Sequence, residues 1–292
     1  MKQKIAIPAS FTRKRHHLSI LGNRRSKTLA IALLCLFVLI VLLLATQIIS
    51  TDGLEINLQA QSQPPSFAHP FGTDWLGRDM LTRTLHGLSL SLWVGLLTAI
   101  CSAVLALVLG TISAIMGGKV DIAITWLIDV FFSLPHLVLI ILVAFAAGGG
   151  VGGLFISIII THWMGLARLL RAEVLQIKNS DYVQLSSRLG RSPFWIARHH
   201  MIPHLFPQFI LGLILMFPHA IIQEEGLPFL GLGLSPETPA LGIILSESMR
   251  YLSAGYWWLS VLPGIALLIA IKAFDILGAS VRALHDPKTS QG

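Results

Sequence analysis

Ionisable residues inside long apolar runs are the residues of this chain best suited to do chemistry. Imidazole nitrogens bind nickel, zinc and copper, and an unpaired charge at membrane depth costs roughly 2.5–3.5 kcal/mol. Eight such residues stand in or near apolar runs: Asp129, His136, His162, His219, Glu224, Glu225, Lys272 and Asp275. They are candidates for lining a solute pathway through a membrane.

Two interpretations of these residues stay open. In the first, each histidine is hydrogen-bonded or solvated and each charge is paired, as Lys272 and Asp275 can be at i, i+3 spacing. In the second, they line a conduit and the histidines help to pass a metal chelate, with the weak binding that conduction requires. No metal site is firmly assigned. Cys35 and Cys101 lie in apolar runs, where we expect neither a disulfide nor a metal cage.

Motifs for catalysis and nucleotide binding are absent from the sequence. It contains no Gly-x4-Gly-Lys-Ser/Thr loop, no His-Glu-x-x-His helix and no Gly-x-Ser-x-Gly elbow. The glycines between Gly148 and Gly153 lack the lysine of a phosphate-binding loop and fit a turn. We therefore predict that the chain is not an enzyme, binds no cofactor itself and does not hydrolyse ATP.

A polar, basic segment over residues 173–203 interrupts the apolar runs. Such a segment cannot lie in hydrocarbon, so we predict a structured loop in water. Residues 181–189 fit a short helix, and Gly190 ends it with a positive φ. Ser192 then caps a second helix that begins at Pro193.

The second loop helix has two faces in the sequence pattern. Phe194, Ala197 and Met201 recur at i, i+3 and i+7 and predict an apolar face. We expect the helix to end at Ile202-Pro203, where the chain enters the membrane again. The two helices together predict a compact projection from the membrane, shaped to meet a soluble partner.

Composition indicates that the whole chain is a membrane protein. Of its 292 residues, 54% are hydrophobic and only 12% charged, whereas soluble domains carry about 25% charged residues. Spans of about 20 residues are expected to be helices, which satisfy their own backbone hydrogen bonds in lipid. The sequence predicts an all-α fold with six transmembrane helices, at 28–49, 88–116, 122–146, 153–172, 204–224 and 257–280.

Positive charge predicts the orientation of these spans. Eight Lys and Arg residues precede the first span, and most others fall on the same side, which favours an N-in, C-in topology. The net charge of +7 then reflects topology, and no nucleic-acid partner is expected.

The predicted divisions are a basic cytoplasmic tail (1–27), an extracytoplasmic segment (50–87), a five-helix core (88–285) with the loop 173–203 and an outer loop (225–256), and a cytoplasmic tail (286–292).

The extracytoplasmic segment carries a second motif just before a helical pattern. Its residues are Phe71, Gly72, Thr73, Asp74, Leu76, Gly77, Arg78 and Asp79. Asp74 is predicted to be the N-cap of a helix that begins at Trp75 or Leu76.

The loop 173–203 resembles the Glu-Ala-Ala loop of permease subunits in bacterial ABC importers. The spacing from Gly190 to Pro203 matches that of the family. Other identities differ: Gln184, Leu185 and Ser186 stand at the Glu-Ala-Ala positions, and His200 and Ile202 at the positions of Ile and Leu. The motif 71–79 and residues 229–236 are similar to the C-type permease of the dipeptide/oligopeptide/nickel family, and Asp286-Pro287 also fits.

The resemblance covers about residues 26 to 287 and implies a type I importer permease fold in the bacterial inner (plasma) membrane. It implies a heterodimer with a second permease, two ATPase subunits that hold ATP and Mg, and an extracytoplasmic solute-binding protein. The substrate would be a peptide, nickel or a metal chelate. By resemblance the loop contacts the ATPase through Tyr182, Gln184, Leu185, Ser186, Arg188, Gly190, Arg191, Ser192, Pro193 and Pro203.

A self-sufficient secondary transporter or channel is the alternative function. It would move its solute without an ATPase, driven by an ion gradient. Inverted repeats of broken helices are typical of such transporters, and none is evident in the sequence.

Overall fold

The computed structural model describes residues 24–230 and 239–285. The predicted tail 1–27 falls almost wholly outside the described residues, as do residues 231–236 of the outer loop pattern, Asp286-Pro287 and the tail 286–292. Within the described residues the regular structure is helical, apart from one isolated bridge between Thr73 and Asp79. The predicted all-α membrane fold is confirmed.

Thirteen helical elements follow one another along the described chain. They are α1 (Arg24–Ile48), η1 (Thr51–Leu54), η2 (Leu58–Ala60), α2 (Met80–Met116), α3 (Gly118–Ser133), α4 (His136–Ala146), α5 (Gly150–Lys178), α6 (Asp181–Arg188), α7 (Pro193–Ile196), η3 (Ala197–Met201, a π-helical turn), α8 (Ile202–Phe229), α9 (Leu241–Leu252) and α10 (Trp258–His285).

Five helices of the described chain are long and apolar enough to cross a membrane, and a sixth crossing results if α3 and α4 form one span. The helix predicted over 122–146 is correct in place but wrong in shape, because α3 and α4 meet at 106°. Leu134 is extended, with φ −94° and ψ 144°, and Pro135 follows it. A proline disfavours the helical conformation in the preceding residue and has no N–H to donate, which explains the break.

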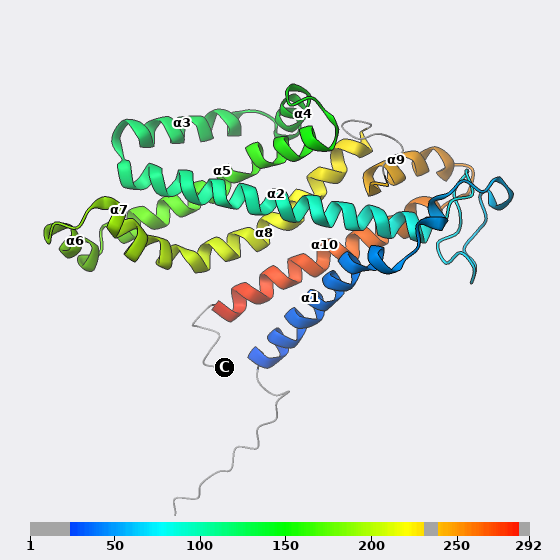
Figure 1. Cartoon of the computed structure of the whole chain (residues 1–292), viewed down its shortest axis with the longest axis horizontal. Coiled ribbons are helices and arrows are strands. Elements are labelled where there is room, and N and C mark those ends of the chain that lie inside the picture. The colour runs from blue at the N-terminus through cyan, green and yellow to red at the C-terminus, as the bar shows by residue number, and fades with distance from the viewer. Residues whose placement is uncertain (1–23, 231–238, 286–292) are drawn as a thin grey trace, which may run out of the picture.

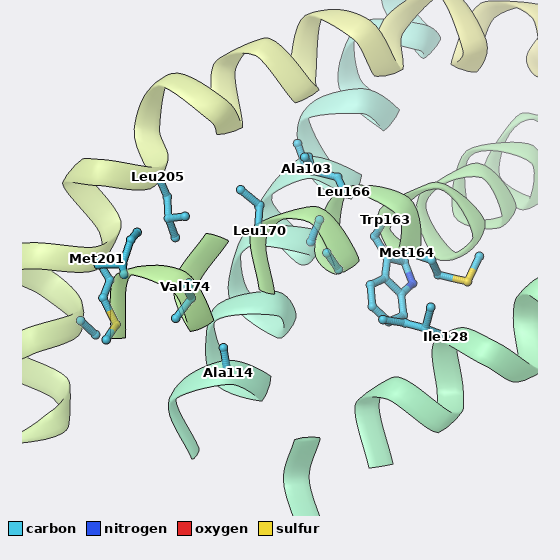
Figure 2. Packing of buried hydrophobic residues seen from close by; sticks show 14 of the residues in the cluster. Ala103, Ala114, Ile128, Trp163, Met164, Leu166, Leu170, Val174, Met201 and Leu205 are labelled. Atoms are coloured by element: carbon cyan, nitrogen blue, oxygen red, sulfur yellow. The ribbon is translucent and has the colours of Figure 1, made fainter. Parts of the chain in front are cut away.

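The most extensive packing between two helices of the described chain is that of α2 against α5, and α1 packs beside α10 (Figure 1). Small residues allow the close approach of α2 and α5: a Cβ on Gly110 would lie 2.6 Å from the carbonyl oxygen of Ala167. Such small-residue contacts are typical of helices in lipid. Around them lies a core that includes Ala103, Leu166 and Leu170 (Figure 2).

The two ends of the bundle carry different structures. At one end α6 and α7 project beyond the long helices, and at the other lie residues 50–79 and α9 (Figure 1). The positive-inside pattern predicts that the α6 and α7 end is cytoplasmic.

Candidate functional site

The first loop helix ends as the sequence predicts. Gly190 follows α6 with φ +81°, its N–H donates to the Ser187 carbonyl at 3.0 Å, and the Arg191 N–H donates to the Ser186 carbonyl at 3.2 Å. These two bonds form a Schellman motif, which requires a left-handed residue at this position. Gly190 therefore fixes the direction in which the chain leaves α6.

The second loop helix begins as predicted but does not end where predicted. Ser192 Oγ accepts a hydrogen bond from the Trp195 N–H at 3.2 Å, and Pro193 is the first helical residue. The helical path continues through η3 into α8 without a break at Pro203. The prediction of an end there is wrong, because the helix continues past Pro203, whose missing N–H coincides with the change from the π-helical turn to α8.

The apolar face of the second loop helix is partly as predicted. Ala197 and Met201 are buried with Ile196 in the core at the end of α5, near Val174 (Figure 2 shows Met201 and Val174). Phe194 is instead 77% exposed, so its assignment to that face is wrong. Phe194 is the second residue of α7, and the chain reaches the core only from Ile196 onward.

Two residues that depart from the family pattern contact each other. Ser186 Oγ of α6 lies 3.1 Å from His200 Nε2 of η3. The His200 ring also meets the Tyr182 ring edge-on, with centroids 5.6 Å apart. This contact joins the two arms of the projection, so residues 181–201, here called the knob, form one packed unit.

Large apolar side chains stay exposed on the knob. Tyr182, Leu185, Leu189 and Phe194 are all exposed, and the exposed Arg188 and Arg191 lie among them in sequence. The Arg191 guanidinium lies over the Trp195 ring, 4.5 Å from its centroid. We call these six exposed residues the coupling surface; it has the apolar and cationic character of a protein-docking surface.

Ion pairs that the sequence analysis missed fix the base of the knob. Arg171 on α5 makes two bonds of 2.6 Å to Asp121 on α3, and Ser113 on α2 also donates to Asp121. Lys178 Nζ donates to the carbonyls of Ala114 and Ile115 at 3.1 and 3.3 Å. The charges stand at predicted span ends, which is a signal that could have suggested this pairing.

At the other end of the bundle, Asp74 organises the outer segment. Its Oδ1 accepts the N–H groups of Leu76 and Arg78 at 2.8 and 2.9 Å. Its Oδ2 accepts from Arg78 Nε and Arg83 Nη1, both at 2.7 Å. The Asp74 side chain is fully buried and Arg83 is 3% exposed. The carboxylate therefore holds together a turn and the start of α2.

The helix start predicted at Asp74 is wrong, because α2 begins at Met80. Asp79 is its N-cap and accepts the Thr82 N–H at 2.8 Å, while His69 Nδ1 lies 2.8 Å from the other Asp79 oxygen. The Asp74 oxygens are already used by the turn and the arginines. Both acids fit the capping pattern in sequence, and only the fold separates their roles.

The glycines of the outer motif permit close chain contacts. Gly77 has φ +76°, and a Cβ there would collide with the carbonyl oxygen of Asn57. Gly72 has φ +71°. Phe71 packs against the buried cluster around Met80, and the Thr73 hydroxyl donates to the Ala60 carbonyl.

The outer segment is also joined to α9. Arg83 Nη2 lies 3.2 Å from Glu247 Oε2, and the Trp75 ring stacks on Tyr251 with centroids 4.7 Å apart. Phe67, in the same segment, is fully exposed. The outer end thus presents an aromatic side chain on a braced scaffold.

The three intramembrane histidines come together. His136 on α4, His162 on α5 and His219 on α8 all line one open groove of about 470 Å³. His136 Nε2 lies 2.8 Å from Gln223 Oε1. The sequence placed these histidines on three helices but gave no sign that the helices converge.

The remaining candidates are paired or buried. Lys272 and Asp275 pair at 3.3 Å, as the first of the two interpretations expects, and Asp129 pairs with Arg168 at 2.7 Å. Glu224 and Glu225 are buried. Glu225 accepts hydrogen bonds from the Ser91 hydroxyl and the Gly242 N–H, so it joins α8 to α2 and α9.

The chain is similar to known transport proteins over most of its length. Residues 106–291 match the family model described as binding-protein-dependent transport system inner membrane component. The Bacillus subtilis dipeptide transport system permease protein DppC is 35% identical over 80% of this chain and 72% of its own length. The oligopeptide permease protein OppC of the same organism is 32% identical over 90% of this chain and 87% of its own. The probable D,D-dipeptide permease protein DdpC of Escherichia coli is 30% identical, covering 89% and 87%.

Proposed function

The chain belongs to the family of binding-protein-dependent transport system inner membrane components, and we propose that it is one of two permease subunits of an ATP-binding-cassette importer for peptides. It is a multi-pass inner membrane protein and not itself catalytic. Two ATPase subunits would bind below the permease pair and an extracytoplasmic solute-binding protein above it.

The coupling surface carries this proposal. It exposes four large apolar side chains and two arginines on a knob that is packed rigidly onto α5. A permease without a nucleotide-binding motif needs a rigid contact through which an ATPase can move its helices. The acid of the family pattern is replaced by Gln184, so the contact with the ATPase relies on apolar packing and on Arg188 and Arg191.

The outer end suits the binding protein. The Asp74 network braces a segment whose fully exposed Phe67 projects where no lipid tail is expected. An aromatic side chain that is exposed on a rigid support and becomes buried on binding is a typical anchor of protein interfaces.

The face formed by α3, α4, α5 and α8 suits the solute pathway. It exposes Asp129, His136, Arg168 and His219 at membrane depth. Polar groups at that depth normally face protein or water instead of lipid. We propose that the second permease covers this face and that the solute passes between the two chains.

Peptides are the substrate class that the relatives' names support. DppC, OppC and DdpC are named for transport of dipeptides, oligopeptides and D,D-dipeptides. Nickel and metal chelates appear in none of these three names.

Affinity purification from the native host tests the proposal. The tagged chain, extracted in mild detergent, is expected to bring down a second permease and at least one ATPase subunit, identified by mass spectrometry. An unrelated tagged membrane protein of similar abundance is the control. Recovery of the chain alone, together with ion-driven peptide uptake by the purified chain in liposomes, would establish the secondary transporter instead.

A further inference from the structure

The hydrogen-bonding character of the histidine groove follows from the ring nitrogens that are already used. His136 Nε2 faces the Gln223 carbonyl-type oxygen at 2.8 Å, so this nitrogen carries the proton and donates. His162 Nδ1 donates in the same way to the Ile158 carbonyl at 3.2 Å. In a neutral imidazole the second nitrogen is then an acceptor. Both rings, which line the groove, therefore keep a free lone pair.

Another polar group of the groove is also an acceptor. The Thr161 hydroxyl donates its proton to the Ser157 carbonyl at 2.8 Å, which leaves its oxygen lone pairs. Among the described residues, the groove lining contains no Lys, Arg, Asp or Glu. The rest is largely apolar, including Leu169, Leu215 and Met216. A carboxylate would find no cationic side chain here and only the N–H groups of Gln223 and His219 as donors, whereas an ammonium group would find acceptors on His136, His162 and Thr161.

We propose that this groove is a weak subsite for the protonated amino group of a peptide in transit. The ammonium donates to the free nitrogens of His136 and His162 while the side chain beside it rests on Leu169 and Leu215. The solute class rests on the proposed function. Weak binding is required because a pathway must also release its cargo.

Thiol protection tests the proposal in the purified full-length chain with its copurifying subunits. Gly165 lines the groove and has no atom within 4 Å of a built Cβ, so Gly165→Cys places a thiol there without a clash. Gly152→Cys is the matched control, since Gly152 lies on the same helix with equal free space and outside the groove lining. The exposed native thiol is removed by Cys101→Ser in both proteins.

The probes separate an amino group from a carboxylate. Alanyl-alaninamide has a free amino group and no carboxylate. N-acetyl-alanyl-alanine has a free carboxylate and no amino group. The amide is expected to slow N-ethylmaleimide modification of the groove thiol about threefold at about twice its Kd, as occupancy predicts. The acetylated peptide should not slow it, and neither probe should protect the Gly152→Cys control.

Substitution of His162 completes the test. His162→Phe should abolish protection, and His162→Gln, which keeps an acceptor oxygen, should retain part of it. Equal protection by both peptides, protection that survives His162→Phe, protection by NiCl₂ alone, or no protection by any probe would each overturn the subsite. Because partner recovery and peptide uptake are measured separately, those outcomes would leave the permease function standing.

Discussion

Replacing Asp74 with alanine is expected to unfold the outer segment while the long helices stay packed. Asp74 is fully buried and accepts four hydrogen bonds, two of them from the guanidinium groups of Arg78 and Arg83. Removing one partner of a buried ion pair typically costs about 3–5 kcal/mol, because the other charge is left without compensation. Among the acids of the described residues, Arg83 would then pair only with Glu247, at 3.2 Å. Hydrogen–deuterium exchange over residues 57–79 measures the loss of protection.

Two variants serve as references for this prediction. Asp52→Ala removes an exposed acid from the same segment and should leave exchange unchanged. Asp74→Asn keeps an acceptor for the turn but loses the charge, so its protection should be intermediate. Unchanged protection over residues 57–79 in Asp74→Ala would show that the ion pairs do not hold the outer segment.

Replacing Gly190 with valine is expected to uncouple ATP hydrolysis from transport without affecting membrane insertion. At φ +81° a residue with a Cβ is strained, by roughly 1–2 kcal/mol, and a β-branched one more so. No atom lies within 4 Å of a Cβ built there, so the effect arises from the backbone alone. A distorted end of α6 would misdirect Leu189 and the rest of the coupling surface. Substrate-stimulated ATPase activity of the reconstituted transporter measures the loss.

Asparagine at the same position is the matched control. Asn occupies the left-handed region far more readily than valine, so Gly190→Asn should keep most of the coupled activity. Wild-type coupling in Gly190→Val, or equal loss in both variants, would contradict a role for the left-handed turn.

Local signals in the sequence were sufficient to place the stop of the first knob helix and the start of the second. The glycine stop, the Ser192 cap and the proline start each depend on neighbouring residues only, and each is found where predicted. The same holds for the pair Lys272 and Asp275, which share one helix face. The positions of the membrane spans could also be predicted from the sequence, because a helix that crosses lipid requires about 20 apolar residues.

Features that depend on distant residues were not predictable in this way. Asp74 and Asp79 both look like helix caps, and only the approach of Arg83 and Asn57 decides that Asp79 is the cap. Phe194 shares an apolar spacing with Ala197 and Met201, and only packing against α5 decides that it stays exposed while they are buried. The convergence of His136, His162 and His219 depends on the bend at Leu134 and on helix packing.

Photo-crosslinking from the coupling surface tests the central claim most directly. Phe194→p-benzoylphenylalanine keeps an aromatic ring at an exposed position, and irradiation of native membranes is expected to join this chain to the ATPase subunit. The same substitution at Phe37, exposed on α1, should give lipid adducts only. A Phe194 product that contains no ATPase, in membranes that transport peptide, would contradict the assignment of the knob as the coupling site.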